Sequence, residues 1–179
     1  SRATYLANAL SPAEGSGITA LAPGSTVDVL ACSGADMTDV DEQLSDPRAA
    51  DPSTPIDLVV LTIGGNDIGF GDLATDCALS GALLGDEAQS GTCRDRHADV
   101  PSTITGRMDD LTATYERVRA AIGAPLVVLP YVDPLPPEGS DVTGCILGPD
   151  TAQFAREVLS TLNDTISRAV QRAGDGVSL

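Results

Sequence analysis

Short apolar runs alternate with amphipathic stretches along this chain of 179 residues. Three of the apolar runs predict β-strands, at residues 26–31, 56–63 and 124–129. The run at 56–63 is apolar almost throughout, as a strand covered on both faces must be, and we expect it to be central in its sheet. Residues 176–179 predict the start of another strand. Strands that alternate with helices are typical of an α/β domain with a parallel sheet.

Two long amphipathic segments, residues 102–122 and 151–173, predict helices. Their apolar residues recur at steps of three and four and so line one face of each helix: Ile104, Met108, Leu111, Tyr115, Val118 and Ile122 in the first, and Phe154, Val158, Leu162, Ile166 and Ala169 in the second. Gly123 and Gly174 follow these segments and predict where each helix ends.

The remaining segments predict short helices and two long loops. Residues 2–10 and 37–44 are expected to be helical. Residues 80–100 and 131–149 are rich in Gly, Pro and Asp, which is typical of loops. Long loops in α/β enzymes often shape a binding site.

The charge balance narrows the partners of this chain. It carries 26 acidic and 10 basic residues, a formal net charge of −16, and such a surface repels the phosphate backbone of nucleic acids. Hydrophobic residues make up 42% of the chain, enough for the core of one domain. No apolar run approaches the roughly 20 residues that a membrane-spanning helix needs. We therefore expect neither a nucleic-acid partner nor a membrane span.

Four cysteines occur, and none forms the close Cys-x-x-Cys pairs typical of zinc sites, so we expect no metal. Cys77 and Cys93 flank a segment rich in Gly, Ser and Asp without a regular period, which favours a local disulfide between them. A disulfide indicates an oxidising, extracellular compartment. Cys32 and Cys145 have no obvious partners within the chain.

The segment from 58 to 70, LVVLTIGGNDIGF, carries the most informative pattern. A buried strand ends at Ile63, two glycines allow a sharp turn, and Asn66 and Asp67 follow at the sheet edge where open parallel sheets bind ligands. The amide of Asn66 is a suitable oxyanion donor because it supplies N–H groups without a titrating charge. The alternative is that residues 64–67 only make a turn, since Gly, Asn and Asp are the commonest turn residues.

A second turn of small residues, CSGAD at residues 32–36, follows the apolar run at 26–31 and is expected at the same edge of the sheet. With these two segments the sequence resembles the SGNH hydrolases, also called the GDSL family of esterases and lipases, and in particular their secreted actinobacterial branch. Residues 64–67 resemble the family's third block, Gly-x-Asn-Asp, and residues 31–35 resemble its second block. The resemblance extends over essentially the whole chain.

By this resemblance, Gly34 supplies a backbone N–H and Asn66 a side-chain N–H to an oxyanion hole. The family's nucleophile is a Ser in a Gly-Asp-Ser block at the end of the first strand, and its general base is a His in a late Asp-x-x-His block. The chain contains neither block. The resemblance therefore places both outside residues 1–179, and it gives Cys32 and Cys145 disulfide partners outside the chain as well.

The fold implied by the resemblance is a three-layer α/β/α sandwich with a flavodoxin-like parallel sheet of strand order 2-1-3-4-5. Residues 1–179 are then a single SGNH-hydrolase-like domain, incomplete at both ends, which lacks the first strand and the end of the last strand. Because the first strand separates the second from the third, we expect no direct pairing between residues 26–31 and 56–63.

The function implied is that of a secreted serine esterase or lipase, which hydrolyses a small-molecule or lipid ester through an acyl-enzyme. No cofactor is implied, and the oligomeric state is not indicated. Without the Ser and the His, the isolated chain is expected to be inactive. The alternative is a non-catalytic, degenerate SGNH-like binding domain. A sugar-binding surface domain is a weaker rival, because such domains display exposed aromatic residues and only five aromatics occur.

Other residues of the chain are poor candidates for the missing nucleophile and general base. His97, the single histidine, lies in a polar segment flanked by arginines, and we expect it to be a solvated surface residue. Ser33 lies beside Gly34 but lacks a nucleophile elbow and a base within its own segment. The acidic residues near the start of the helix predicted at 37–44 are expected to be structural rather than metal ligands: Asp36, Asp39, Asp41 and Glu42.

Overall fold

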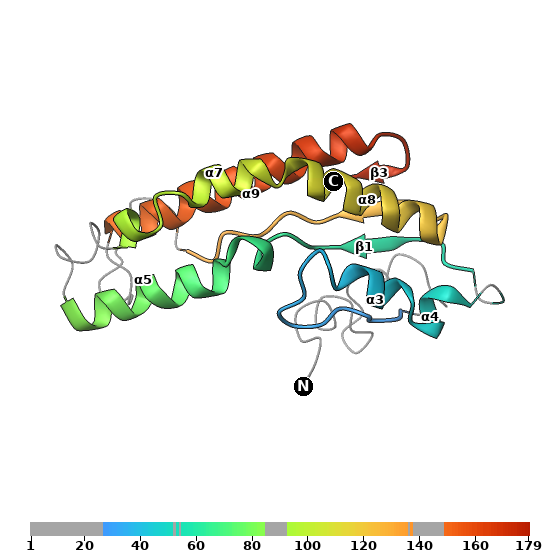
Figure 1. Ribbon diagram of the computed structural model, residues 1–179, viewed down its shortest axis with the longest axis horizontal. Helices are drawn as coiled ribbons and strands as arrows, with labels where there is room; N and C mark the ends of the chain where they lie inside the picture. The colour runs from blue at the N-terminus through green and yellow to red at the C-terminus, as the bar shows by residue number, and fades with distance from the viewer. Residues whose placement is uncertain (1–26, 52, 54, 85–92, 136, 138–148) are drawn as a thin grey trace.

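The computed structural model describes residues 27–51, 53, 55–84, 93–135, 137 and 149–179. The helix predicted at residues 2–10 and the cysteine Cys145 lie outside these residues. The elements are, in chain order, α3 (Val40–Leu44), α4 (Pro47–Ala50), β1 (Val59–Leu61), the 3-10 helix η2 (Asn66–Ile68), α5 (Phe70–Leu84), α7 (Val100–Gly106), α8 (Met108–Ile122), β2 (Leu126–Val128), α9 (Pro149–Ala173) and β3 (Val177–Ser178) (Figure 1).

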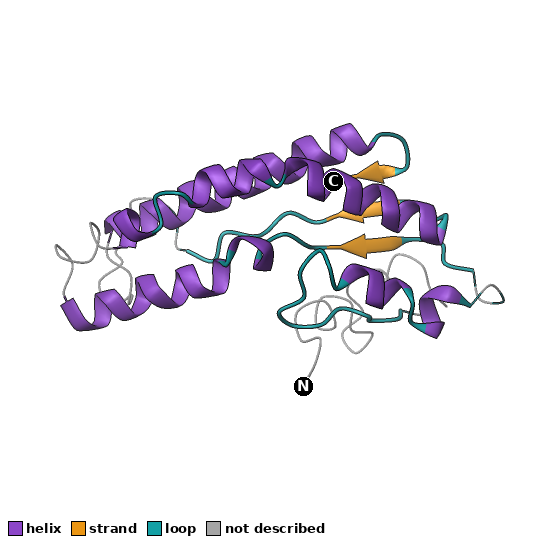
Figure 2. Ribbon diagram, in the orientation of Figure 1, coloured by secondary structure: helices purple, strands orange, loops and turns teal. Residues whose placement is uncertain are grey.

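The described strands form one parallel sheet in the order β1, β2, β3, and their arrows point the same way in Figure 2. Val59 of β1 is the register partner of Leu126 of β2, which is in turn the partner of Val177 of β3. A long helix precedes each of the last two strands, α8 before β2 and α9 before β3, as the crossovers of a parallel sheet require. The α/β class predicted from the sequence is confirmed.

The strands are shorter than the apolar runs that predicted them. The run at 56–63 contributes only the three residues of β1, and Leu58 just before it is 41% exposed. The prediction that this strand is central is wrong for the described residues, where β2 lies in the middle and β1 pairs along one edge. Residues 27–31 form no strand, and within the described chain they make no backbone hydrogen bond to β1. Strands exist through pairing, so apolar character alone does not make one.

The helix predicted at 102–122 is two helices. α7 ends at Gly106 and α8 begins at Met108, because Arg107 between them leaves helical geometry with a ψ of 2°. Gly106 has a low helix propensity and accounts for a break at this point. The end predicted at Gly123 is confirmed by its left-handed φ of 77°. The other long helix, α9, begins two residues before the predicted 151 and is followed by Gly174, with a φ of 80°, as predicted.

Helix α5 contradicts the loop predicted over residues 80–100. It runs through residue 84, and helical geometry resumes at residues 93–96 and in α7. Its sequence mixes glycine, polar and apolar residues, so no clean apolar stripe marks it. Tertiary contacts hold it instead, because Leu73 and Cys77 are buried and Cys77 is bonded to Cys93. The predicted disulfide is confirmed, whereas Cys32 is a free, exposed cysteine.

The core lies between one face of the sheet and helices α8 and α9, which pack side by side along it (Figure 1). Leu126 and Val128 of β2 are fully buried, while Val127 between them is only partly buried. The helices contribute the other large side chains that are fully buried, among them Leu111, Tyr115, Leu162 and Ile166. Within the described residues, no helix combines the length and the apolar character needed to cross a membrane.

Candidate active site

The turn after residues 27–31 holds Gly34 in a conformation that favours glycine. The N–H of Ala35 donates to the carbonyl of Cys32 at 3.2 Å and closes a four-residue turn. Gly34 is its third residue and has a φ of 84°, a value that turns with a left-handed third residue require. Gly34 is exposed, and within the described chain its own N–H donates no hydrogen bond. No described residue therefore engages this N–H.

The turn after β1 needs both of its glycines, for different reasons. Gly64 has a φ of 110°, and a Cβ there would lie 3.1 Å from Cδ2 of Leu111. A Cβ on Gly65 would lie 2.9 Å from Cζ of Tyr131 and 2.8 Å from its hydroxyl oxygen. Gly64 is needed because other residues rarely adopt its positive φ. Gly65 is needed because a side chain there would collide with the ring of Tyr131. Asn66 then begins the 3-10 helix η2.

Two hydrogen bonds join these turns. Nδ2 of Asn66 donates to the carbonyl of Ala35 at 2.7 Å, and the N–H of Met37 donates to Oδ1 of Asp67 at 3.1 Å. Ala35 directly follows Gly34, so the first bond holds the Asn66 amide beside the Gly34 turn. The structure thus brings together the two small-residue turns that the sequence singled out.

The direction of the Asn66 side chain bears on the alternative that residues 64–67 only form a turn. An asparagine of that kind bonds to its own turn, whereas the Asn66 side chain reaches the carbonyl of Ala35, 31 residues away. An amide nitrogen carries two hydrogens, and Ala35 accepts one of them. The bond to Ala35 does not use the second hydrogen, which is compatible with the oxyanion-donor role predicted for Asn66.

Asp67 is a partly buried carboxylate of this region. Its Oδ1 accepts the Met37 bond, and its Oδ2 is buried without a hydrogen-bond partner among the described residues. Burial raises the pKa of Asp67 above its ordinary value, the Met37 bond opposes that rise, and the charge of Asp36 adds to it. The pKa of Asp36 is itself lowered, chiefly by its hydrogen bond with the Thr38 hydroxyl.

We expect these two carboxyls to titrate on opposite sides of the ordinary value of 3.8, Asp67 above it and Asp36 below it. The contribution of Asp67 to stability is then fully present below its unfolded pKa and is lost as the pH rises through its folded pKa. The contribution of Asp36 has the opposite sign, since it is present above the unfolded pKa and is lost as the pH falls through the folded one. Carboxyl ¹³C NMR across an acid titration measures both midpoints.

The variant Asp36→Asn is the matched control for this titration. It removes a nearby negative charge and should lower the Asp67 midpoint without abolishing its elevation, because burial is the larger cause. An Asp67 midpoint at or below 3.8 in the wild-type protein would contradict the burial that the structure shows.

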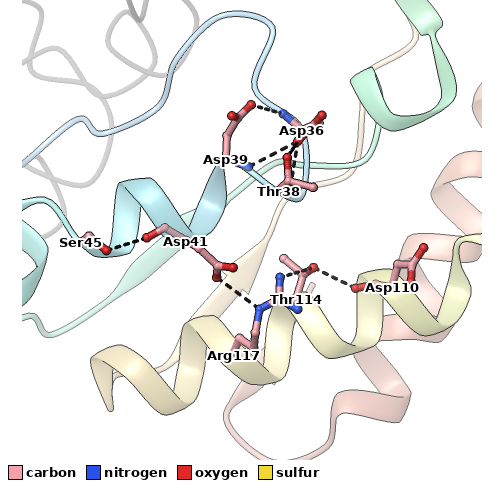
Figure 3. A network of polar contacts seen from close by, with 8 residues as sticks. All are labelled: Asp36, Thr38, Asp39, Asp41, Ser45, Asp110, Thr114 and Arg117. Atoms are coloured by element: carbon pink, nitrogen blue, oxygen red, sulfur yellow. Dashed lines mark hydrogen bonds and ion pairs between the residues drawn. The ribbon is translucent and has the colours of Figure 1, made fainter.

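Asp36 also organises the link between the Gly34 turn and α3 (Figure 3). Its Oδ1 accepts the N–H and the hydroxyl of Thr38 at 2.8 and 2.6 Å, and Oδ2 of Asp39 accepts the N–H of Asp36 at 2.9 Å. These side-chain bonds compete with helical geometry, so α3 begins at Val40 and not at the predicted residue 37. They agree with the structural role predicted for Asp36 and Asp39.

Asp41 connects α3 to α8 through Nε of Arg117 at 3.3 Å, and Arg117 donates in turn to the Thr114 hydroxyl (Figure 3). Both charged side chains are well exposed, so the pair orients the helices more than it stabilises them. In the part of the chain that the structure describes, no group of three or more His, Cys, Asp or Glu side chains is arranged to hold a metal ion.

A hollow of about 740 Å³ adjoins the Gly34 turn, and Asn66 does not line it. Its walls are residues 29–35 and the polar side chains of Asp39, Glu42, Gln43, Ser45, Asp46 and Arg48. Arg48 is paired with Asp46 at 2.9 Å, which leaves the carboxylates of Asp39 and Glu42 as the excess charge. A negative wall favours a neutral ligand over an anionic one.

His97 and Ser33 take no part in the contacts of Asn66. Nε2 of His97 lies 3.3 Å from Oδ2 of Asp76, and the histidine side chain is 19% exposed. The prediction that His97 is a solvated surface residue is therefore wrong, because its side chain is mostly buried. Its backbone N–H donates to the carbonyl of Cys93, which places it against the disulfide. Ser33 is exposed, and no base contacts it within the described chain.

Sequence reasoning missed Tyr131 and Asn163. Tyr131 contacts the turn after β1 directly, and Asn163 contacts Tyr131. The hydroxyl of Tyr131 accepts the N–H of Gly65 at 2.9 Å, and the amide of Asn163 bonds the Tyr131 backbone twice. Two signals existed. Tyr131 follows an apolar run, as Asn66 does, and Asn163 is a polar residue four positions after Leu159, at the edge of an apolar stripe.

A parallel sheet whose strands alternate with helices, with two glycine-containing turns joined beyond the carboxyl end of β1, defines an α/β protein with its candidate site at the strand exits. The chain belongs to the GDSL-like Lipase/Acylhydrolase family, which residues 3–178 match. Lipase 2 of Streptomyces coelicolor is 30% identical to it over 133 residues, 68% of this chain and 42% of that protein.

Two solved structures are similar in both sequence and fold. The extracellular lipase of Streptomyces rimosus matches with a TM-score of 0.63 and 29% identity, over 82% of this chain and 57% of that one. The phospholipase A1 of Streptomyces albidoflavus matches with a TM-score of 0.65 and 32% identity, over 84% and 58%. These neighbours confirm the SGNH resemblance and the fold class. The chain spans about half the length of these relatives.

Proposed function

We propose that this chain carries the oxyanion-binding part of a secreted serine esterase or lipase. The observation that carries the proposal is the Asn66 amide, held at 2.7 Å by the carbonyl of Ala35, the residue after Gly34, whose own N–H donates no hydrogen bond to any described residue. Membership of the GDSL-like lipase/acylhydrolase family supports ester chemistry. The names of the relatives, lipase and phospholipase A1, support the same reaction class.

The proposed reaction is acyl transfer from a carboxylic ester to a serine and then to water. As the serine oxygen adds to the ester carbonyl, the carbonyl oxygen becomes an oxyanion, and the N–H groups of Gly34 and Asn66 bind it. Donors fixed before the reaction are effective because they need no reorganisation when the charge develops. The 179 residues contain neither Gly-Asp-Ser nor Asp-x-x-His, so the proposal assigns the nucleophile and the base to other residues of the complete protein.

Two observations bear on compartment and substrate. The buried Cys77–Cys93 disulfide and the extracellular lipase among the structural neighbours support secretion. The excess of carboxylates along the hollow beside Gly34 supports a neutral ester, from a small molecule or a lipid, over a substrate with an anionic reacting end.

The complete protein should hydrolyse p-nitrophenyl butyrate and react covalently with a fluorophosphonate, whereas the 179-residue chain should do neither. The chain retains only two oxyanion donors, and these have no nucleophile to act on. Steady-state hydrolysis and mass spectrometry of the labelled protein measure the two outcomes. A complete protein that binds the ester without hydrolysing it would support the non-catalytic alternative.

The variants Ser33→Ala and His97→Ala control for a misplaced triad. His97→Ala should leave hydrolysis by the complete protein within about twofold of wild type, since His97 takes no part in the contacts of Asn66 and changes away from the site are usually small. Turnover by the isolated chain that either variant abolishes would overturn the assignment of the nucleophile and base.

A further inference from the structure

Tyr131 is held from both sides of its backbone by one side chain of α9. Oδ1 of Asn163 accepts the N–H of Tyr131 at 2.9 Å, and Nδ2 of Asn163 donates to its carbonyl at 2.8 Å. The neighbouring residues Leu162 and Ile166 are fully buried in the core. A paired amide contact from a helix anchored in this way fixes the position of Tyr131 relative to the sheet.

The fixed tyrosine in turn restrains the residue before Asn66. The hydroxyl of Tyr131 accepts the N–H of Gly65 at 2.9 Å, and its ring occupies the space that a Cβ on Gly65 would need. Burial raises the pKa of the Tyr131 hydroxyl, so it stays neutral at physiological pH. The same bond engages the Gly65 N–H, which is then not offered to a ligand beside Asn66.

Two contacts therefore restrain Asn66: Ala35 accepts from its side chain, and Tyr131 accepts from the N–H of the residue before it. Resting on the proposed function, we propose that Tyr131, oriented by Asn163, is a positioning residue for the Asn66 oxyanion donor. It acts through Gly65 and does not touch the substrate. A donor displaced by about 1 Å loses much of its effect on the transition state, which can cost on the order of 100-fold in rate.

The test compares variants of the complete protein with p-nitrophenyl butyrate. Tyr131→Phe keeps the ring against Gly65 and removes only the acceptor, and we expect kcat to fall about tenfold, with KM within about twofold. Asn163→Ala, which frees the tyrosine backbone, should lower kcat at least as much. Tyr115→Phe is the matched control, because the Tyr115 hydroxyl is buried without a hydrogen-bond partner among the described residues, and its kcat should not change.

Repeating Tyr131→Phe in an Asn66→Ala background separates positioning from a general structural role. If Tyr131 acts through Asn66, the fall in kcat disappears in that background, because the donor it positions is gone. A fall that persists there, or no fall in the single variant, overturns the inference. If Asn66→Ala by itself lowers kcat, the proposed function is supported whichever result Tyr131→Phe gives.

The side-chain NH₂ signals of Asn66 in a ¹⁵N–¹H spectrum give a readout that does not depend on activity. Tyr131→Phe should shift these signals together with the backbone N–H of Gly65, and Tyr115→Phe should shift neither. Unchanged Asn66 signals overturn the positioning inference. A wild-type protein that shows the Tyr131-dependent shift but no ester hydrolysis overturns the proposed function and leaves the contact between Tyr131 and Asn66 established.

Discussion

Replacing Asn66 by alanine in the complete protein should lower kcat for p-nitrophenyl butyrate about 10²- to 10³-fold, with little change in KM. Under the proposed function, the Asn66 amide donates most strongly to the oxyanion, which develops in the transition state and is absent from the bound ester. The loss corresponds to about 3 to 4 kcal/mol of transition-state stabilisation. Steady-state kinetics, corrected for the folded fraction by circular dichroism, measures it.

Gln153→Ala serves as the control for Asn66→Ala, because it also removes an amide side chain, from an exposed position on α9. It should change kcat by less than about twofold. The opposite result would be an Asn66→Ala variant that melts at lower temperature but has unchanged activity per folded molecule. That outcome would mean that residues 64–67 only form a turn, and that the bond from Asn66 to Ala35 is structural.

The second large effect is expected at the disulfide. The double variant Cys77→Ala, Cys93→Ala should lower the free energy of unfolding by about 3 kcal/mol. The disulfide restricts the unfolded chain by closing a loop between the two cysteines, and a loop of this length is worth about that much. The separation of the two cysteines is 16 residues, and both are buried, Cys93 completely. Urea unfolding followed by circular dichroism measures the change.

A thiol reductant provides the control for this prediction. Dithiothreitol should destabilise the 179-residue chain by a similar amount and leave the double variant of that chain unchanged, because the bond between Cys77 and Cys93 is then absent. Cys32, a free thiol in this structure, should not contribute to the difference. Equal stability of the wild-type protein with and without the reductant would contradict a stabilising role for Cys77–Cys93.

Local periodicity determined the parts of the fold that the sequence predicted well. The stripes of apolar residues in α8 and α9 lie against the sheet as expected, and glycines with positive φ end both helices. Periodicity failed for α5, whose residues show no clean stripe, and at Arg107, where one predicted helix became two. It also predicted a strand at 26–31 that the described residues 27–31 do not form, because a strand depends on its neighbours and not on its own residues.

The candidate site divides in the same way. Residue type and place in the chain were sufficient to single out Gly34 and Asn66, because glycine at positive φ and an amide at a strand exit are local features. The bond between Asn66 and Ala35 links residues 31 apart, and the bond between Gly65 and Tyr131 links residues 66 apart. No local pattern encodes such pairs, since they arise when β1, β2 and α9 pack together.

The sequence by itself thus determined the α/β class, the family, the disulfide and the two turns that carry neutral donors, because each depends on periodicity, residue chemistry or short spacing. Only the tertiary structure decided which hydrogen bonds join the two turns, that Gly65 must be glycine to accommodate the Tyr131 ring, and that Asn163 holds that tyrosine in place. The physical reason is that hydrogen bonds across the fold depend on distances that packing of the core sets, and no single segment of the chain predicts these distances.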